Sequence, residues 1–304
     1  MKHLRFCIFF GLGLKYAFMD SNCSEAIQTA SQIPQGGICL LVIDQQVDFH
    51  PGGSLAIQHA VDDAERTAAF INSNQQLISQ IILTMDSHQQ YHIAHGVFWK
   101  NSRNECPEPF TRITEADIQN DVWVPRQIEL RDYTLYYTRT LETRGKFVLC
   151  IWPEHCIIGT PGHNIVSVIH KAALNWSKSS LRPIEYVMKG MNSFTEHYSA
   201  LRSEVEIPFD ASTRLNEKLV INLKRADRIV ICGEASSHCV AHTVRDLLDC
   251  WPCDRVKDLY LFSDCVSPVC GYEAIAEEFL SQFQKEGVNV ITSKNYNHHS
   301  ISSS

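Results

Sequence analysis

The most reactive side chain in this sequence is Cys239, which follows a turn of small residues. Before that turn, the apolar run at residues 228–232 predicts a buried strand, and the spacing after Cys239 predicts an amphipathic helix. The positive end of a helix and a nearby cation can lower a thiol pKa to 7 or below. The pattern therefore predicts a nucleophile. A buried structural cysteine would fit the same stretch, because cysteine is among the most buried residue types.

Three further reactive side chains come at the ends of apolar runs typical of buried parallel strands: Asp44, Asp86 and Lys189. In an open parallel sheet such ends lie along one edge, so we expect these residues to meet there with Cys239. An aspartate can take the thiol proton and return it to a leaving amine, and a lysine can stabilise the anions. Together they predict an acyl-transfer site.

Asp86 also begins a histidine-rich segment that contains His88, His92 and His95, and His155 follows later. One carboxylate and several imidazoles near a strand end form a mixed nitrogen and oxygen site that suits Zn, Fe or Mn. The sequence predicts a divalent metal here. The surplus of histidines leaves the ligand set open.

The elements that would position these residues alternate between strands and helices, which predicts an α/β fold. We expect a three-layer αβα sandwich with a central, mainly parallel six-stranded sheet. The expected strands are 37–44, 81–85, 185–188, 228–232, 259–262 and 288–292, and the main expected helices are 55–78, 114–119, 163–176, 213–223 and 272–286, besides the one after Cys239. Residues 1–35 are expected to be an extension, 36–295 one domain with an elaboration at about 97–150, and 296–304 a disordered tail.

Composition narrows the class of function. The 304 residues are 44% hydrophobic and 20% charged, as in a globular enzyme, and the net charge of -7 without basic clusters argues against nucleic-acid or anionic-membrane partners. Twelve irregularly spaced cysteines favour reduced thiols and a cytoplasmic protein. The alternative is export, because a basic start and the apolar residues 6–14 resemble a short signal peptide that Lys15 interrupts.

Five motifs in this order resemble the nicotinamidase branch of the isochorismatase-like cysteine hydrolases: VIDQQVDF with PGGSL, the D-x-H-x3-H segment, WPEHCIIGTPG, the K-G pair, and GEASSHCV. The resemblance covers residues 37–295. It implies that Asp44, Lys189 and Cys239 form a catalytic triad. It also implies that Asp86, His88 and His155 hold one divalent metal, with His92 as an additional neighbour of that metal.

The same resemblance implies a substrate pocket in which Phe49 and Trp152 flank a pyridine ring. It implies a cis peptide bond between Glu234 and Ala235, in the turn that forms the oxyanion hole. The implied metal is zinc, with iron or manganese as alternatives. The implied partner is a small carboxamide, nicotinamide first, and a homo-oligomer is left open.

Three departures from the family pattern make an amidase for another small carboxamide the close alternative. Ser237 stands where an aspartate is common, Ser87 stands where an aromatic residue is usual, and residues 97–150 lengthen a segment beside the pocket. A different class of function would use Cys250 and Cys253 as a C-x-x-C pair for disulfide exchange or metal binding. That pair follows a helix, and the sequence has no second pair to complete a zinc site.

Overall fold

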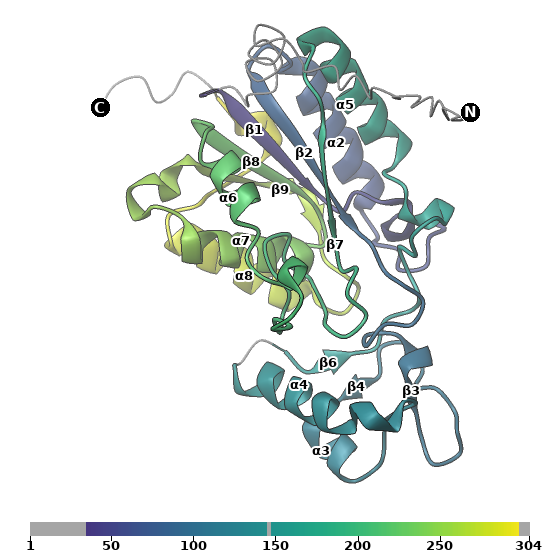
Figure 1. Cartoon of the computed structure of the whole chain (residues 1–304). Coiled ribbons are helices and arrows are strands. Elements are labelled where there is room, and N and C mark those ends of the chain that lie inside the picture. The colour runs from purple at the N-terminus through teal and green to yellow at the C-terminus, as the bar shows by residue number, and fades with distance from the viewer. Residues whose placement is uncertain (1–34, 145–146, 298–304) are drawn as a thin grey trace, which may run out of the picture. The chain divides into compact units, whose positions relative to one another are not determined.

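The structure is a computed structural model that describes residues 35–144 and 147–297. Its centre is a six-stranded sheet in the order β10-β9-β8-β1-β2-β7, in which every neighbouring pair is parallel (Figure 1). The strands are β1 (Ile38–Ile43), β2 (Ile78–Asp86), β7 (Glu185–Lys189), β8 (Arg228–Glu234), β9 (Leu259–Ser267) and β10 (Asn289–Ile291). Helices cover both faces, which confirms the predicted three-layer α/β fold.

Strand β1 lies in the centre of the sheet, and its position explains why its residues are all apolar. Alternate residues of β1 belong to two separate hydrophobic cores, one on each face of the sheet: Ile38, Leu40 and Val42 in one, and Cys39, Leu41 and Ile43 in the other. Because side chains alternate along a strand, a sheet covered on both sides needs apolar residues at every position. The run can therefore end only where the sheet ends, at Asp44.

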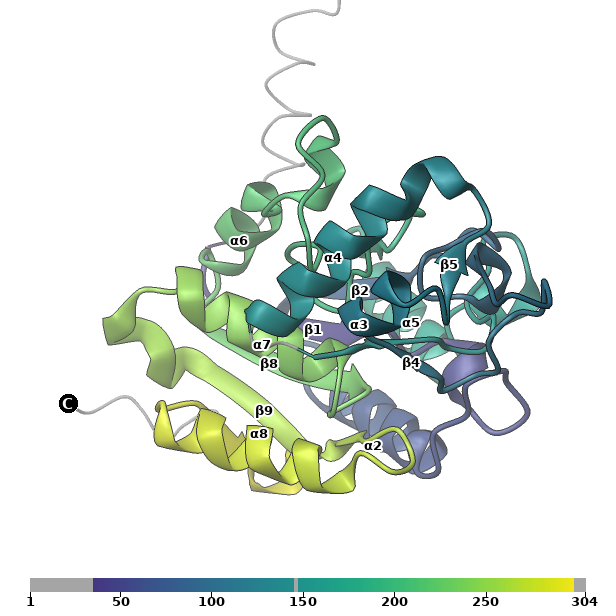
Figure 2. The same ribbon diagram turned by 90° about the horizontal axis from the view of Figure 1, so that it is seen from below.

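Helices pack against both faces of the sheet (Figures 1 and 2). The first face carries α2 (Ala60–Ser73) and α5 (Ser167–Ser180), and the second carries α6 (Glu217–Leu223), α7 (Cys239–Cys250) and α8 (Glu273–Lys285). The helix expected at 55–78 is shorter than predicted. The N–H groups of Leu55 and Ile57 instead bond to the carbonyls of Asp48 and Phe49, and residue 78 already begins β2.

The elaboration at 97–150 is a small subdomain of two short antiparallel ribbons and two helices. Its elements are β3 (Trp99–Lys100), β4 (Arg112–Ile113), α3 (Glu115–Gln119), β5 (Val124–Pro125), α4 (Arg131–Thr143) and β6 (Leu149–Cys150), with β3 paired to β5 and β4 to β6. A capping box between Thr114 and Asp117 starts the predicted helix α3. Helix α4 was not predicted, because threonines supply much of its buried face and hide the apolar period.

Hydrogen bonds join this elaboration to the segment that follows β7. The hydroxyl of Tyr133 donates to the carbonyl of Phe194 at 2.6 Å, and the N–H of Glu196 donates to the hydroxyl of Tyr137 at 2.9 Å. At the C-terminal end, Tyr296 was assigned to a disordered tail, but its ring packs against Phe70 and Phe262. The expectations for residues 1–34 and 298–304 lie outside the described residues. In the part that is described, no helix has the length and apolarity needed to cross a bilayer.

Candidate active site

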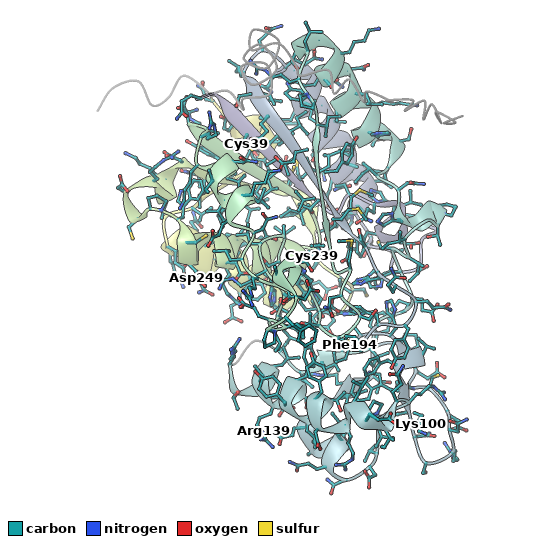
Figure 3. The ribbon with its side chains drawn as sticks, in the orientation of Figure 1. Cys39, Lys100, Arg139, Phe194, Cys239 and Asp249 are labelled. Carbon is teal, nitrogen blue, oxygen red and sulfur yellow. The ribbon has the colours of Figure 1, made fainter. Side chains whose placement is uncertain are left out.

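The strand ends that the sequence singled out meet at one edge of the sheet. Asp44 follows β1, Asp86 ends β2, and Lys189 ends β7 directly opposite Asp86 in the strand pairing. Cys239 is the first residue of α7, after the turn that leaves β8, and lies in the interior of the molecule in Figure 3. The structure brings these four residues together, as predicted.

Lys189 connects the members of this cluster. Its Nζ lies 2.8 Å from Asp44 Oδ2, 3.0 Å from Asp86 Oδ1 and 3.4 Å from Cys239 Sγ, and it donates to the carbonyl of His197 at 3.0 Å. Burial alone would lower the pKa of Lys189, but the two carboxylates outweigh it and the pKa lies well above its ordinary value. The side chain is therefore a buried ammonium ion between two carboxylates.

Asp44 is held by Thr84, a residue that the sequence reasoning missed. The Thr84 hydroxyl donates to Asp44 Oδ1 at 2.5 Å and accepts the Asp44 N–H at 3.0 Å. The φ of Asp44 is 45°, a conformation that non-glycine residues adopt at a cost and that occurs often at functional sites. Burial raises the pKa of Asp44, and the Lys189 charge and the Thr84 hydrogen bond oppose that rise. A carboxylate with a raised pKa is better suited to accept a proton.

The thiol of Cys239 differs from the sequence expectation. Burial raises its pKa well above the ordinary value; Lys189 lowers it, but Asp44 and Asp86 raise it further. The expectation of a thiol made acidic by the helix end is therefore wrong, because that reasoning left out burial and the two carboxylates. Cys239 needs a base at the moment of reaction. Its Sγ lies within 4.8 Å of a carboxylate oxygen of Asp44 and of one of Asp86.

The turn between β8 and α7 carries the expected cis peptide bond between Glu234 and Ala235. Ala235 and Cys239 both line the pocket at this edge of the sheet. Within residues 35–144 and 147–297, no acceptor pairs with the backbone N–H of either residue. The first N–H groups of a helix lack an acceptor inside the helix, so they can serve a developing oxyanion.

Ser237, one of the departures from the family pattern, supports a neighbouring histidine. Its hydroxyl accepts the N–H of Val269 at 3.1 Å and lies 2.8 Å from His238 Nδ1. The His238 ring lines the same pocket and packs edge-on against Trp152, with centroids 5.0 Å apart. Burial lowers the pKa of His238 to about 3, so this imidazole is neutral. No periodic pattern in the sequence indicates this residue.

The pocket above Cys239 is mainly aromatic and apolar. It is lined by Phe49, Leu55, Asp86, Trp152, His155, Glu196, Tyr198, Ala235, His238, Cys239 and Val269. The two aromatic residues predicted to flank a ring, Phe49 and Trp152, are both there and both buried. Trp152 donates its indole N–H to the Tyr198 hydroxyl at 2.9 Å, and Phe110 of the elaboration packs against it at 5.9 Å. The elaboration therefore reaches the pocket wall.

The predicted metal ligands lie beside this pocket. Asp86 Oδ2 is 3.0 Å from His88 Nε2 and 3.3 Å from His155 Nε2. His155 Nδ1 lies 2.8 Å from the carbonyl of Pro153, which places the ring proton on Nδ1 and leaves Nε2 free to bind a metal. These donors fit a divalent ion of the zinc type. Asp86 belongs to both clusters, because its Oδ1 faces Lys189 and its Oδ2 faces the imidazoles.

Two more side chains, those of His92 and Glu196, lie close to His88. His88, His92 and Glu196 offer ligand atoms within 4.8 Å of one another. His92 Nε2 and Glu196 Oε2 are buried, and neither has a hydrogen-bond partner among the residues that the structure describes. His92 Nδ1 accepts the N–H of Ala94 at 3.2 Å, which places the proton of a neutral ring on Nε2, toward this group. Glu196 was not predicted, because it lies in an irregular segment without a period.

Side chains that bond to the backbone hold the candidate metal ligands in place. The Gln46 side chain donates to the carbonyl of Asp86 at 2.8 Å and accepts its N–H at 2.7 Å. Asp48 Oδ2 accepts the N–H of Cys156, next to His155, at 2.7 Å. Gly190 has a φ of 78°, and a Cβ there would lie 2.9 Å from His88 Cε1, so the K-G pair requires glycine.

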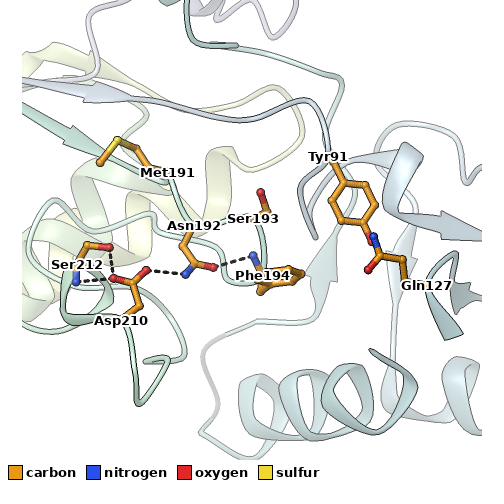
Figure 4. Close-up of a pocket in the computed structure, with 8 residues that line it drawn as sticks. All are labelled: Tyr91, Gln127, Met191, Asn192, Ser193, Phe194, Asp210 and Ser212. Carbon is orange, nitrogen blue, oxygen red and sulfur yellow. Dashed lines mark hydrogen bonds between the residues drawn. The ribbon is translucent and has the colours of Figure 1, made fainter. Parts of the chain in front are cut away.

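A second hollow of about 430 Å³ lies outside this cluster and is lined by Tyr91, Gln127, Met191, Asn192, Ser193, Phe194, Asp210 and Ser212 (Figure 4). Asp210 accepts from Asn192 at 2.7 Å and from the Ser212 N–H at 2.9 Å, while Asn192 accepts the Phe194 N–H at 2.9 Å. These groups bond to one another, which supports the segment from Lys189 to Glu196.

The C-x-x-C pair lies away from the catalytic cluster. Cys250 ends α7, and Cys253 is exposed in the turn that follows. Both are free thiols, and among the described residues neither belongs to a group that could hold a metal. The predicted position at the C-terminal end of a helix is confirmed.

Comparison with known proteins relates this architecture to one group of enzymes. No protein-family model matches the chain. The nicotinamidase of Escherichia coli K12 is 24% identical over 215 residues, which cover 69% of this chain and 75% of that protein. A nicotinamidase/pyrazinamidase structure from Acinetobacter baumannii has a TM-score of 0.57 at 22% identity, covering 87% of this chain and 99% of its own.

The structure of a pyrazinamidase from Pyrococcus horikoshii in complex with zinc has a TM-score of 0.51 at 19% identity, covering 84% of this chain and 99% of its own. At these identities the structural matches establish the fold, and the curated relative adds similarity of sequence. The chain is therefore similar in sequence to a nicotinamidase and shares the isochorismatase-like fold of nicotinamidase and pyrazinamidase structures.

Proposed function

We propose that this protein is a metal-dependent cysteine amidohydrolase that converts nicotinamide and water to nicotinate and ammonia. The observation that carries the proposal is the buried cluster of Asp44, Lys189 and Cys239 beside a carboxylate–histidine group, in a chain similar in sequence to a nicotinamidase. The pocket above Cys239 is lined mainly by aromatic and apolar side chains, which suits a planar aromatic amide.

In the proposed reaction, Asp44 takes the proton of Cys239 as Sγ attacks the amide carbonyl. The N–H groups of Ala235 and Cys239 stabilise the oxyanion, and one such donor is typically worth about 3–4 kcal/mol in acyl transfer. The C–N bond then breaks and Asp44 returns the proton to the leaving ammonia. A water molecule, deprotonated by Asp44, hydrolyses the thioester and restores the thiol. Lys189 keeps its proton throughout and balances the carboxylates.

The metal would be held by Asp86, His88 and His155, and the zinc-bound pyrazinamidase relative supports zinc. When bound, the ion supplies a Lewis acid that can accept the pyridine nitrogen and draw electron density from the amide. Phe49 and Trp152 would hold the faces of the ring. His92 and Glu196, each with a buried polar atom that lacks a partner among the described residues, would lie next to the ion.

A second candidate within the class is an amidase for another small carboxamide. It is favoured by two features of the pocket wall, the imidazole of His238 and the contact between Phe110 and Trp152. Either feature changes the shape or polarity of the site without touching the cluster around Lys189. Ammonia release measured across a panel of carboxamides separates the two candidates, because only the first has nicotinamide as its preferred substrate.

Replacement of the nucleophile tests the covalent mechanism. We expect Cys239→Ala to abolish ammonia release while the metal content stays near that of the wild-type protein, since Sγ is not among the proposed ligands. Mass spectrometry of rapidly quenched wild-type enzyme should detect an acyl adduct on Cys239. Retained turnover in the alanine variant would overturn the thioester mechanism.

A further inference from the structure

The turn that carries Ala235 is fastened to the end of β9. Glu234 pairs with Ser267 in the β8–β9 ladder, and the N–H of Ser236 donates to the carbonyl of Ser267 at 2.8 Å. Strand β9 runs to Ser267, beyond the end expected at residue 262. This extra length forms the backbone support of the turn.

The side chain of Glu234 adds a second, unexpected support. It is completely buried, it accepts the N–H of Ser267 on Oε2 at 3.2 Å, and it accepts from the side chain of Gln45 on Oε1 at 3.3 Å. Gln45 directly follows Asp44. The carboxyl group of Glu234 therefore joins the turn before the nucleophile to the loop that carries the proposed base.

The carboxyl group of Asp63 on α2 is also buried. Asp63 and Glu234 share one hydrogen-bond partner, Ser267. The hydroxyl of Ser267 donates to Asp63 Oδ2 at 2.5 Å, and Arg66 forms an ion pair with Asp63 Oδ1 at 2.7 Å. Two neighbouring buried carboxyl groups cannot both ionise without a large cost. Burial, and then the Asp63 carboxylate, raise the pKa of Glu234 well above its ordinary value. The carboxyl group of Glu234 therefore favours its neutral form.

We propose that Glu234 is a positioning residue whose carboxyl group, hydrogen-bonded to Ser267 and Gln45, fixes the turn so that the Ala235 N–H faces the reacting carbonyl. This inference rests on the proposed amidase function. It adds a buried pair of neighbouring carboxyl groups, joined through Ser267, that never touches the substrate. The pair acts on the oxyanion donor through the backbone and not through the pocket wall.

The test uses the full-length protein with its bound metal and measures kcat and KM for nicotinamide. Glu234→Gln keeps a neutral side chain of the same size and one accepting oxygen but loses the second acceptor, so it should lower kcat less than Glu234→Ala does. Glu234→Ala should lower kcat by about 100-fold at unchanged KM, as when an oxyanion donor is lost. Glu185→Ala is the matched control, because Glu185 bonds to Gln80 and Asn222 at the other end of the sheet. It should leave kcat unchanged.

A direct readout accompanies the kinetics. The infrared difference spectrum of wild type minus Glu234→Gln at pH 7 should contain the carbonyl stretch of a protonated carboxyl group. If Glu234→Ala does not fold, Ser267→Ala replaces it, with an expected loss of about tenfold in kcat alone. An alanine variant with normal kcat, a glutamine variant as impaired as alanine, or a missing band would each overturn the proposal. A wild-type protein that hydrolyses no carboxamide would overturn the proposed function instead, and the band alone would then decide the acid pair.

Discussion

The substitution Thr84→Val isolates one hydrogen bond that lowers the pKa of Asp44. Valine has nearly the shape of threonine but lacks the hydroxyl that donates to Asp44 Oδ1 at 2.5 Å. A hydrogen bond to a charged group contributes about 1.5–3 kcal/mol. Because one pKa unit corresponds to about 1.4 kcal/mol, the loss should raise the pKa of Asp44 by roughly one to two units.

The assay is kcat/KM for ammonia release as a function of pH, since its acid limb reports the essential base of the free enzyme. We expect the limb of Thr84→Val to move to higher pH by roughly one to two units. Thr84→Ser is the matched control, because it keeps the hydroxyl and should follow the wild type.

Thr84→Val should also lower the free energy of unfolding, by an amount that depends on pH. The folded-state pKa of Asp44 is raised, so its stabilising effect is fully present below the unfolded-state pKa and is lost as pH rises through the folded-state pKa. Thr84→Val raises that folded-state pKa further. The loss in free energy of unfolding relative to wild type should therefore be largest at neutral pH and shrink as pH falls, as measured by urea denaturation. A pH–rate profile of Thr84→Val that coincides with the wild type would refute Asp44 as the base.

Two further substitutions test the supports of the site. Gln46→Leu removes both hydrogen bonds to the backbone of Asp86 and should weaken metal binding about 10- to 100-fold, as is typical when a residue that supports a metal ligand is replaced. Metal retention after dialysis against a series of chelators measures this affinity. An unchanged affinity would contradict the prediction. His238→Phe keeps an aromatic ring but removes the polar edge in the pocket, so carboxamides with a second polar substituent should lose more kcat/KM than nicotinamide. An equal loss across the panel would show that His238 serves packing alone.

The sequence indicated which edge of the sheet carries the candidate site, because strands that are buried on both faces are apolar throughout. Each parallel strand is an apolar run, and the first charged residue after it lies at the sheet edge. Asp44, Asp86 and Lys189 were predicted on this basis, and the structure places all three at that edge. Sequence could locate them without knowing the strand order, because all carboxyl ends of a parallel sheet share one edge.

Residues in irregular segments, or inside a strand, could not be predicted in the same way because no sequence pattern marks them. Thr84 lies inside an apolar strand, where threonine is simply a good strand former. Glu196 and Tyr198 lie in a segment held by side-chain hydrogen bonds and without a period, so nothing in the sequence places them beside the pocket. Helix α4 was missed because its threonines satisfy backbone carbonyls within the helix and look polar while buried.

The raised pKa values of Asp44 and Cys239 do not conflict with the proposed reaction. Burial raises the pKa of both groups for the same reason, because each becomes charged when it loses its proton. Transfer of a proton from Sγ to the carboxylate leaves the net charge of the buried cluster unchanged, so most of the burial cost cancels. The energy that remains is the difference between placing the charge on Asp44 and placing it on Cys239. Lys189 Nζ lies close to both, 2.8 Å from Asp44 Oδ2 and 3.4 Å from Cys239 Sγ. In the proposed reaction the balance between thiol and thiolate therefore depends on how readily Asp44 accepts the proton, and the hydrogen bond from Thr84 lowers the pKa of that carboxyl group.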